Sequence, residues 1–298
     1  MRRLLTLFLG LSVCMSYSNL FAQEKTADSG PPKRLQLVIE EVKPGKGAAH
    51  QKSEAAWLAS FLQANVPAYG IGMTSMTGRN EAWFINVMGD SWAEYDKWDK
   101  QVSGNKMVSA ELAKASTTDG ELLNGTRTVF LSYVPDMSYR PDFKLGEYKY
   151  FMVDTVRVKP GHGKEFSDIR KAVNAAHEKA NMDEHMLVYY ASMGGMGGTY
   201  YIFEPVKSIA SLDQVDKLHG EDSAYRKALG EDFTKMNREF AQNGLISVQN
   251  DMFAIDPKMS YVSEETAKLA PGFWMSKTAL AKARPAPMAK PTATKEGQ

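Results

Sequence analysis

The chain has 298 residues, a length that favours two domains or one large domain over a single small module. Hydrophobic residues make up 43% and charged residues 24%, as in a globular protein with a substantial core. The net charge is +1, and without Arg2 and Arg3 it is −1, since 34 basic side chains then face 35 acidic ones. This balance argues against nucleic acid or an anionic membrane surface as the main partner.

Residues 1–22 are predicted to be a signal peptide. Arg2 and Arg3 precede the apolar run LLTLFLGLSVC, and Ala22 is the expected cleavage point. The run is too short to span a membrane comfortably, and we predict no transmembrane segment elsewhere. The protein is therefore expected to be exported, to the periplasm or the medium. The only cysteine, Cys14, lies in the signal peptide, so the mature chain would have no disulfide.

The first structured region is predicted at residues 35–140, after a polar, proline-containing linker at residues 23–34. Periodicity indicates, in chain order, a strand, a helix, a hairpin, a helical stretch and a closing strand. Their ranges are 35–42, 48–65, 69–76 with 81–87, 92–115 and 126–135.

The same order of elements recurs at residues 147–262. A strand at 147–158 is followed by a helix whose apolar stripe contains Phe166, Ile169, Val173 and His177. Two hairpin strands flank MGGMGG (193–198), and helical segments lead to a last strand. Residues 263–298 are predicted to form a tail that is largely disordered from about residue 282.

Matching junctions indicate that the two regions are copies. VKPGKG begins at Val42 and VKPGHG begins at Val158, 116 positions later. Each copy has the order β-α-β-β-α-β, the ferredoxin-like unit, whose helices cover only one face of its sheet. The predicted fold class is α+β, with two tandem ferredoxin-like (βαββαβ) repeats forming an intrachain pair. Whether the copies close on each other or on another chain stays open, so the protein is expected to be a monomer or a homodimer.

The strand ending in V-K-P-G-H-G-K-E-F, the helix after it and the duplicated layout resemble the dimeric α/β-barrel superfamily, in particular its NIPSNAP and antibiotic-biosynthesis-monooxygenase types. The resemblance covers about residues 35–261. It implies a ligand cavity inside the barrel or between sheet and helices. Members include cofactor-free oxygenases, haem-degrading enzymes, chlorite dismutases and proteins without a known reaction, so the fold alone assigns no activity. The Asn, Trp and His set of the haem-degrading members has no match in this chain.

Alternation along the first strand of each copy suggests catalytic candidates. An apolar face is expected to meet the helices; it contains Leu35, Leu37 and Ile39 in the first copy and Phe151 and Val153 in the second. Glu40 and Asp154 would then point between the sheets, where a carboxylate can serve as a general base. His185, at the start of a neighbouring strand, could join Asp154 in a polar cluster. The alternative is that both carboxylates are paired or hydrated and that His185 lies at the surface.

Aromatic residues suggest where a ligand would bind. The candidates for ligand binding are Tyr150, Tyr189, Tyr201, Trp83 and His177. At the 116-residue offset His177 takes the place of Phe61, and the alternative is a core histidine with satisfied hydrogen bonds. His50, His162 and His219 are expected to be solvated, and no two histidines have His-x-x-x-His spacing, so we predict no metal site. MGGMGG is expected to be a flexible hairpin that could cover a cavity.

Three functions follow from these observations. The first is an exported protein that binds a small apolar or aromatic molecule in a cavity between the sheets. The second is a cofactor-independent monooxygenase or a haem-handling enzyme of the same fold. The third is a structural protein without a ligand. No cofactor is predicted, and haem is the one cofactor that the resemblance leaves open.

Overall fold

The computed structural model describes residues 30–64 and 69–274. The predicted signal peptide at 1–22 with Cys14, residues 23–29 of the linker and the tail from about residue 282 lie outside the described residues.

Strands and helices follow the same order in both halves of the chain. In the first half they are β1 (Arg34–Val42), α1 (Gly47–Gln63), β2 (Gly70–Ser75), β3 (Glu81–Val87), α2 (Trp92–Gly104), α3 (Lys106–Gly120) and β4 (Leu123–Tyr133). In the second they are β5 (Tyr150–Val158), α4 (Gly163–Lys179), β6 (Leu187–Met193), β7 (Thr199–Val206), α5 (Leu212–His219), α6 (Ala224–Asn243) and β8 (Leu245–Ile255). Two short helices follow, α7 (Glu264–Leu269) and α8 (Pro271–Trp274).

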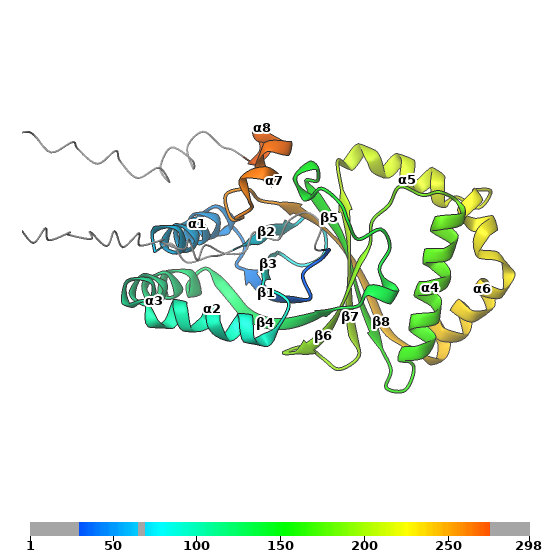
Figure 1. Cartoon of the computed structure of the whole chain (residues 1–298), viewed down its shortest axis with the longest axis horizontal. Helices are drawn as coiled ribbons and strands as arrows, with labels where there is room; N and C mark the ends of the chain where they lie inside the picture. The colour runs from blue at the N-terminus through cyan, green and yellow to red at the C-terminus, as the bar shows by residue number, and fades with distance from the viewer. Residues whose placement is uncertain (1–29, 65–68, 275–298) are drawn as a thin grey trace, which may run out of the picture.

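The eight strands form one closed antiparallel barrel in the order β1-β3-β2-β8-β5-β7-β6-β4. β2 pairs with β8 and β4 pairs with β6, and these two ladders join the halves of the chain. The barrel therefore closes within one chain, which the sequence had left open. Helices α1, α2 and α3 lie on one side of the barrel and α4, α5 and α6 on the other (Figure 1). The predicted α+β class is confirmed.

Apolar side chains fill the barrel interior, and here one prediction was wrong. The faces of β1 and β5 expected to meet the helices instead belong to the interior core; they contain Leu35, Leu37, Ile39, Phe151 and Val153. Glu40 and Asp154 therefore lie on the outer face of the barrel, toward the helices. Alternation separates the two faces of a strand but does not say which one is inside. In this barrel the apolar set of β1 and β5 fills the interior, and the other face of these strands meets the helices.

Local geometry is the same at equivalent points of the two halves. A register shift separates Glu41 from Val42 in β1 and Arg157 from Val158 in β5, 116 positions later. The turn after each strand is closed in the same way, by Lys46 N donating to Lys43 O and by His162 N donating to Lys159 O. The two KPG junctions thus bend the chain identically from strand to helix.

Side-chain caps set the starts of several helices. Ser91 accepts a hydrogen bond from Glu94 N at the start of α2, and Asn105 accepts from Met107 N and Val108 N at the start of α3.

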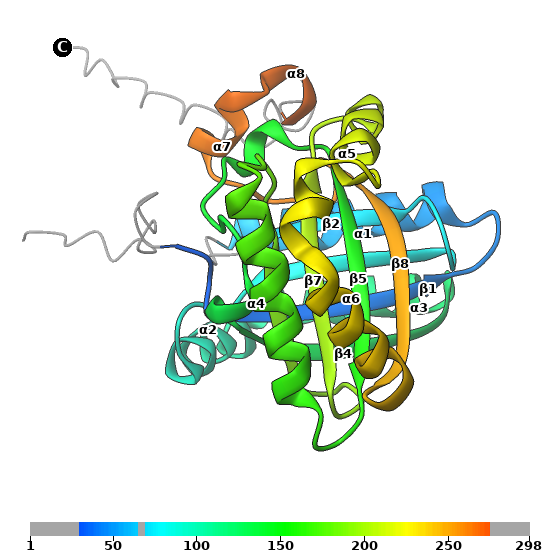
Figure 2. The same ribbon diagram turned by 90° about the vertical axis from the view of Figure 1, so that its right-hand side faces the viewer.

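In the second half, α4 and α6 lie across β5, β7 and β8 (Figure 2). Their contact with the sheet is apolar and includes Val156, Phe166, Ile169, Val188, Ile202 and Phe240.

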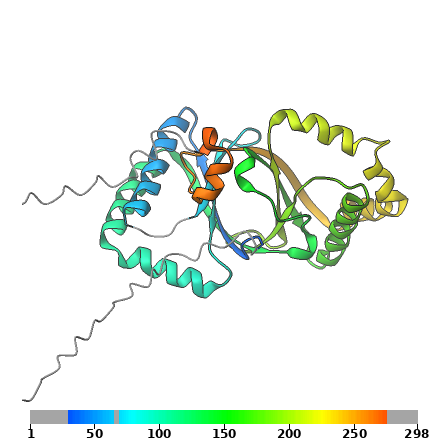
Figure 3. The same cartoon turned by 45° about the horizontal axis from the view of Figure 1, so that its top comes forward.

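One end of the barrel is closed by the last described residues. Trp274 is buried against the interior core, and its Nε1 donates to Gly146 O at 2.9 Å. Phe143 and Leu145 pack beside it. Figure 3 shows α7 and α8 between the two helix groups. In the part of the chain that the structure describes, no helix has the length and apolarity that crossing a membrane requires.

Candidate functional site

The opposite end of the barrel is open and forms a cavity of about 570 Å³, which we call the barrel mouth. It lies where β1 and β5 end and where β3, β4, β7 and β8 begin. Its lining residues are Arg79, Glu81, Trp83, Arg127, Val129, Thr155, Arg157, Gly194, Gly195, Met196, Thr199, Tyr201, Ser247, Val248 and Gln249. A volume of this size is typical of small-molecule sites.

Two aromatic rings form the floor of the barrel mouth. Trp83 of β3 and Tyr201 of β7 meet edge to face, with ring centroids 5.9 Å apart. Trp83 also packs on Phe253 of the interior core at 4.5 Å, and its Nε1 donates to Glu81 Oε2 at 2.7 Å. Burial raises the pKa of Tyr201 and Arg127 partly opposes the shift, so the phenol keeps its proton at neutral pH.

Three arginines surround this floor. Among the described residues, no carboxylate lies within ion-pair distance of Arg79, Arg127 or Arg157. The Nε of Arg157 is buried and has no hydrogen-bond partner there. Glu41 shares a hollow of about 210 Å³ beside the mouth with Arg79 and Arg127. The unpaired guanidinium groups make the rim attractive to an anion.

The MGGMGG hairpin forms one lip of the barrel mouth. Gly194 has a φ of +79°, and a Cβ there would lie 2.1 Å from Thr128 O of β4. Gly198 has a φ of +77°, and a Cβ there would lie 2.3 Å from Val158 O of β5. Glycine is therefore required because the hairpin backbone lies directly against two strands. Met196, at the tip, is 58% exposed at the rim.

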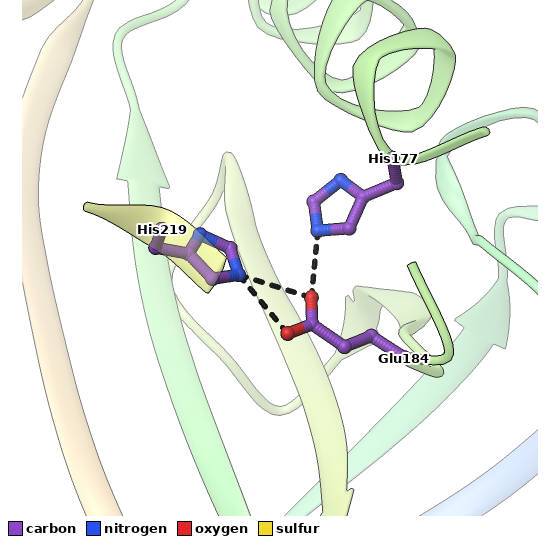
Figure 4. Close-up of side chains that lie close together, drawn as sticks. All are labelled: His177, Glu184 and His219. Atoms are coloured by element: carbon purple, nitrogen blue, oxygen red, sulfur yellow. Dashed lines mark hydrogen bonds and ion pairs between the residues drawn. The ribbon is translucent and has the colours of Figure 1, made fainter. Parts of the chain in front are cut away.

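A second group of polar side chains lies outside the barrel in the second half; we call it the His177 cluster (His177, Glu184 and His219). His177 Nε2 is 2.8 Å from Glu184 Oε2, and His219 Nε2 lies 3.0 and 3.1 Å from the two oxygens of Glu184 (Figure 4). The Val173 carbonyl accepts from His177 Nδ1 at 2.8 Å, which leaves Nε2 facing Glu184. Tyr225 lies 4.5 Å from both imidazole rings.

Hydrogen bonds within the His177 cluster favour the charged forms of Glu184 and His219. Burial opposes ionisation of Glu184, but the hydrogen bonds from His177 and His219 outweigh it and lower the pKa of Glu184 to about 2. The hydrogen bond to Glu184 raises the pKa of His219. Two imidazole nitrogens and a carboxylate within 4.8 Å of one another are also a ligand set suited to a transition-metal ion.

His177 is not suited to be an axial haem ligand. An axial histidine needs a free ring nitrogen, whereas both nitrogens of His177 are engaged, Nδ1 by Val173 and Nε2 by Glu184. Neither the barrel mouth nor the hollow beside it contains a residue of the cluster. We therefore assign no haem-dependent step to it.

A third group lies between β1 and the helices of the first half; we call it the Glu40 cluster (Glu40, His50, Glu54 and Asp119). His50 Nε2 is 2.7 Å from Glu40 Oε2, 3.9 Å from Glu54 Oε1 and 3.8 Å from Asp119 Oδ1. His50 was expected to be solvated, but it is only 1% exposed. That prediction was wrong because its partners come from a strand and another helix, which the spacing along the chain does not reveal.

The predicted catalytic residues do not come together. Asp154 lies on the outer face of β5, where it accepts from Asn250 Nδ2 at 2.6 Å. Burial, together with Asp154, raises the pKa of the neighbouring Glu204 to about 7, and Arg170 partly opposes the shift. His185 lies at the closed end of the barrel, with its Nδ1 2.6 Å from Arg140 O. The expected cluster of Asp154 and His185 is therefore wrong, because Asp154 lies on the outer face of β5 and His185 lies at the closed end of the barrel.

The predicted ligand-binding aromatics divide into three groups. Trp83 and Tyr201 line the barrel mouth. Tyr189 is buried in the interior core, where its hydroxyl donates to Pro32 O at 3.0 Å. Tyr150 alternates with the buried Phe151 and so lies on the outer face of β5.

Several residues of these sites were not anticipated. Glu54 follows His50 by one helical turn, a spacing that could have signalled a shared face. Glu184 and His219 carry no such signal, because both lie beyond the end of α4, 7 and 42 positions after His177. His219 was expected to be solvated, but it is half-buried against Glu184.

Comparison with known proteins finds only distant structural similarities. No family model and no curated protein matches the chain. A proposed monooxygenase from Fusobacterium nucleatum has 12% identity and a TM-score of 0.49, over 74% of this chain and 91% of that one. An anthrone oxidase-like protein has 10% identity and a TM-score of 0.48, over 77% and 93%.

A mutant chlorite dismutase from Candidatus Nitrospira defluvii has 9% identity and a TM-score of 0.44, over 80% and 95% of the two chains. These similar structures are of the dimeric α/β-barrel type. At such identities and TM-scores they say nothing about what this protein binds or catalyses. The expected NIPSNAP relationship stays a prediction.

Proposed function

We propose that the protein binds, in the barrel mouth, a small molecule that has an aromatic or apolar part and an acidic group. The observation that carries this proposal is the set of three guanidinium groups without a carboxylate partner, around a floor of Trp83 and Tyr201. The predicted apolar or aromatic ligand is thereby refined: the interior that an apolar molecule would need is filled by side chains, whereas the open space is cationic.

The chemistry of the rim explains the preference for an acidic group. A planar guanidinium can donate two parallel hydrogen bonds to a carboxylate, sulfonate or phosphate. A buried donor without an acceptor costs about 1–3 kcal/mol, and an anionic group reaching Arg157 Nε would remove that cost. The indole of Trp83 offers an apolar surface directly below the rim.

The wider setting completes the proposal. The two halves are tandem ferredoxin-like repeats, which the matching strand orders and KPG junctions support. The mature protein acts outside the cytoplasm after removal of residues 1–22, which the composition of that segment supports. One chain thus supplies a complete barrel and its mouth.

An anionic dye and an uncharged analogue test this function. We expect 8-anilinonaphthalene-1-sulfonate to bind at one site per chain, and uncharged N-phenyl-1-naphthylamine to bind at least tenfold more weakly. Arg157→Gln should weaken binding of the sulfonate by about tenfold to a hundredfold, because a hydrogen bond to a charged group contributes about 1.5–3 kcal/mol. Arg238→Gln on the exposed face of α6 is the matched control and should change nothing.

Fluorescence titration and calorimetry would measure both affinities. Equal binding of the two dyes, or unchanged sulfonate binding by Arg157→Gln, would contradict the proposal. If no acidic aromatic compound binds at all, the result would favour the alternative that this is a structural protein without a ligand.

The enzyme alternative depends on the His177 cluster, where an imidazole and a carboxylate lie in hydrogen-bond contact. Such a pair can act in acid–base catalysis when a substrate reaches it. Neither the barrel mouth nor the hollow beside it includes the cluster, so the binding function is better supported. Oxygen consumption with electron-rich aromatic acids, lost in Glu184→Gln but retained in the control Glu178→Gln, would instead favour the oxygenase.

A further inference from the structure

The Glu40 cluster joins three elements of the first half. Glu40 comes from β1, His50 and Glu54 lie one turn apart on α1, and Asp119 lies in the last turn of α3. One ligand atom from each of the four residues can be chosen so that all lie within 4.8 Å of one another. Around a divalent ion with bonds of about 2.1 Å, adjacent ligand atoms lie roughly 3 Å apart and opposite ones roughly 4 Å apart. The cluster is already close to those separations.

The charge of the cluster is not balanced by the protein. Three carboxylates surround one imidazole, and among the described residues no Lys or Arg forms an ion pair with any of them. Asp119 also lies at the C-terminal end of α3, where the helix dipole disfavours negative charge.

One buried oxygen points to a ligand directly. Asp119 is 4% exposed, and its Oδ1 has no hydrogen-bond partner among the described residues. That atom lies 3.8 Å from His50 Nε2 and so faces into the cluster. A buried carboxylate oxygen is destabilising unless a donor or a cation satisfies it, and a cation bound within the cluster would do so.

The second half shows that the fold does not need these polar residues. At the 116-residue offset, Val156, Phe166 and Arg170 occupy the positions of Glu40, His50 and Glu54. There Phe166 packs on Phe240 at 5.7 Å within an apolar core that fixes the helices to the sheet. The first half has no comparable apolar core among the described residues: α2 buries no residue, and α3 buries only Val108 and Asp119.

We infer that Glu40, His50, Glu54 and Asp119 bind a divalent transition-metal ion that joins α1 and α3 to β1. Three oxygen ligands with one imidazole suit Mn²⁺, Fe²⁺ or Zn²⁺ better than Ca²⁺ or Mg²⁺, which take oxygen ligands almost exclusively. The ion supplies in the first half the attachment of helices to sheet that Phe166 and its neighbours supply in the second. The site shares no residue with the barrel mouth, so it does not depend on the proposed ligand.

The test uses the full mature protein, stripped with a chelator and then titrated with Mn²⁺. Electron paramagnetic resonance should show one bound Mn²⁺ per chain, and Mn²⁺ or Zn²⁺ should raise the melting temperature by several degrees while Mg²⁺ does not. Asp119→Asn should weaken Mn²⁺ binding about tenfold or more, since it removes a charged ligand. Glu239→Gln, on the exposed face of α6 and outside both polar clusters, is the matched control and should bind Mn²⁺ as the unmodified protein does.

Glu54→Gln separates metal binding from a purely structural role. It should raise the melting temperature of the metal-free protein, because it removes a buried carboxyl group under repulsion, and it should abolish the rise caused by Mn²⁺. The inference would be overturned by the absence of Mn²⁺ binding at about 1 mM metal, a concentration at which such a ligand set should be occupied. It would equally be overturned if Asp119→Asn, folded by circular dichroism, bound Mn²⁺ unchanged.

Discussion

The two halves of the molecule share a framework and differ in the layer between sheet and helices. The second half has an apolar layer there, with Phe166 and Phe240 stacked below α4 and α6. The first half has His50 at the position of Phe166, surrounded by three carboxylates. The register shifts and turns are nevertheless identical. Strand pairing therefore tolerates large changes in this layer, provided that some interaction attaches the helices.

Farther along the helices the arrangement is reversed: the aromatic pair lies in the first half and the polar cluster in the second. Phe61 of α1 stacks on Trp98 of α2 with ring centroids 6.1 Å apart. At the 116-residue offset Phe61 corresponds to His177, which lies against His219 at 5.6 Å and is bridged to it by Glu184. The Glu40 cluster of the first half and the His177 cluster of the second half therefore lie at non-equivalent positions.

The barrel mouth has features that the two halves share and features in which they differ. Trp83 and Tyr201 occupy equivalent positions. Trp83 pairs with Ile39 of β1, and Tyr201 pairs with Thr155 of β5, which lies 116 positions after Ile39. By contrast, Glu41 and Arg157, which are also equivalent, have opposite charges. The aromatic floor is common to both halves, while the charge of the rim is not.

The largest expected effect concerns the apolar layer of the second half. Phe166→Ala should lower the free energy of unfolding by about 3–5 kcal/mol, because it leaves a cavity under α4. Phe61→Ala removes the same type of side chain from the helix layer of the first half and should cost only about 1–2 kcal/mol, since that ring is half-buried. Urea denaturation measures both. Similar losses would show that the two helix layers are equally packed.

The next effect is a pH dependence from the His177 cluster. The lowered pKa of Glu184 means that its contribution is complete above its ordinary value of 4.5 and is lost as the pH falls toward 2. The raised pKa of His219 means that its contribution is complete below 6.5 and is lost as the pH rises through the raised value. Glu184→Gln should therefore cost most between pH 4.5 and 6.5, by about 1–2 kcal/mol after allowance for solvent screening.

Thermal unfolding of both proteins across pH 2 to 9 would record this difference. We expect the two curves to converge at the acid end and to approach each other again at the alkaline end. A constant difference across the range would mean that Glu184 contributes through packing and not through its charge.

The smallest expected effect concerns the rim of the barrel mouth. Glu41→Gln should tighten binding of 8-anilinonaphthalene-1-sulfonate about twofold to fivefold, because an exposed charge contributes only about 0.2–1 kcal/mol. The control is Glu265→Gln, on the exposed face of α7. Weaker binding by Glu41→Gln would mean that this carboxylate contacts the ligand and does not repel it.

The order of strands and helices was readable from the sequence, because the KPG junctions and alternating runs are local signals. Which face of each strand lies inside the barrel could not be read from the sequence. Leu37 and Glu40 mark the two faces of β1, but the alternation does not show which face points to the interior. Trp83 and Tyr201 were anticipated as ligand contacts from their strand positions. Arg157 was missed because nothing near it in the chain shows that three arginines converge at one end of a barrel.

Crystallography with 4-bromobenzoate tests the central claim most directly, because bromine scatters anomalously and marks its own position. The account predicts one bromine peak in the barrel mouth above Trp83 and Tyr201, with the carboxylate within hydrogen-bond distance of Arg127 or Arg157. Crystals of Arg157→Gln soaked identically should show a weaker peak or none. Bromine bound elsewhere, or an empty mouth at saturating ligand, would contradict the proposed function.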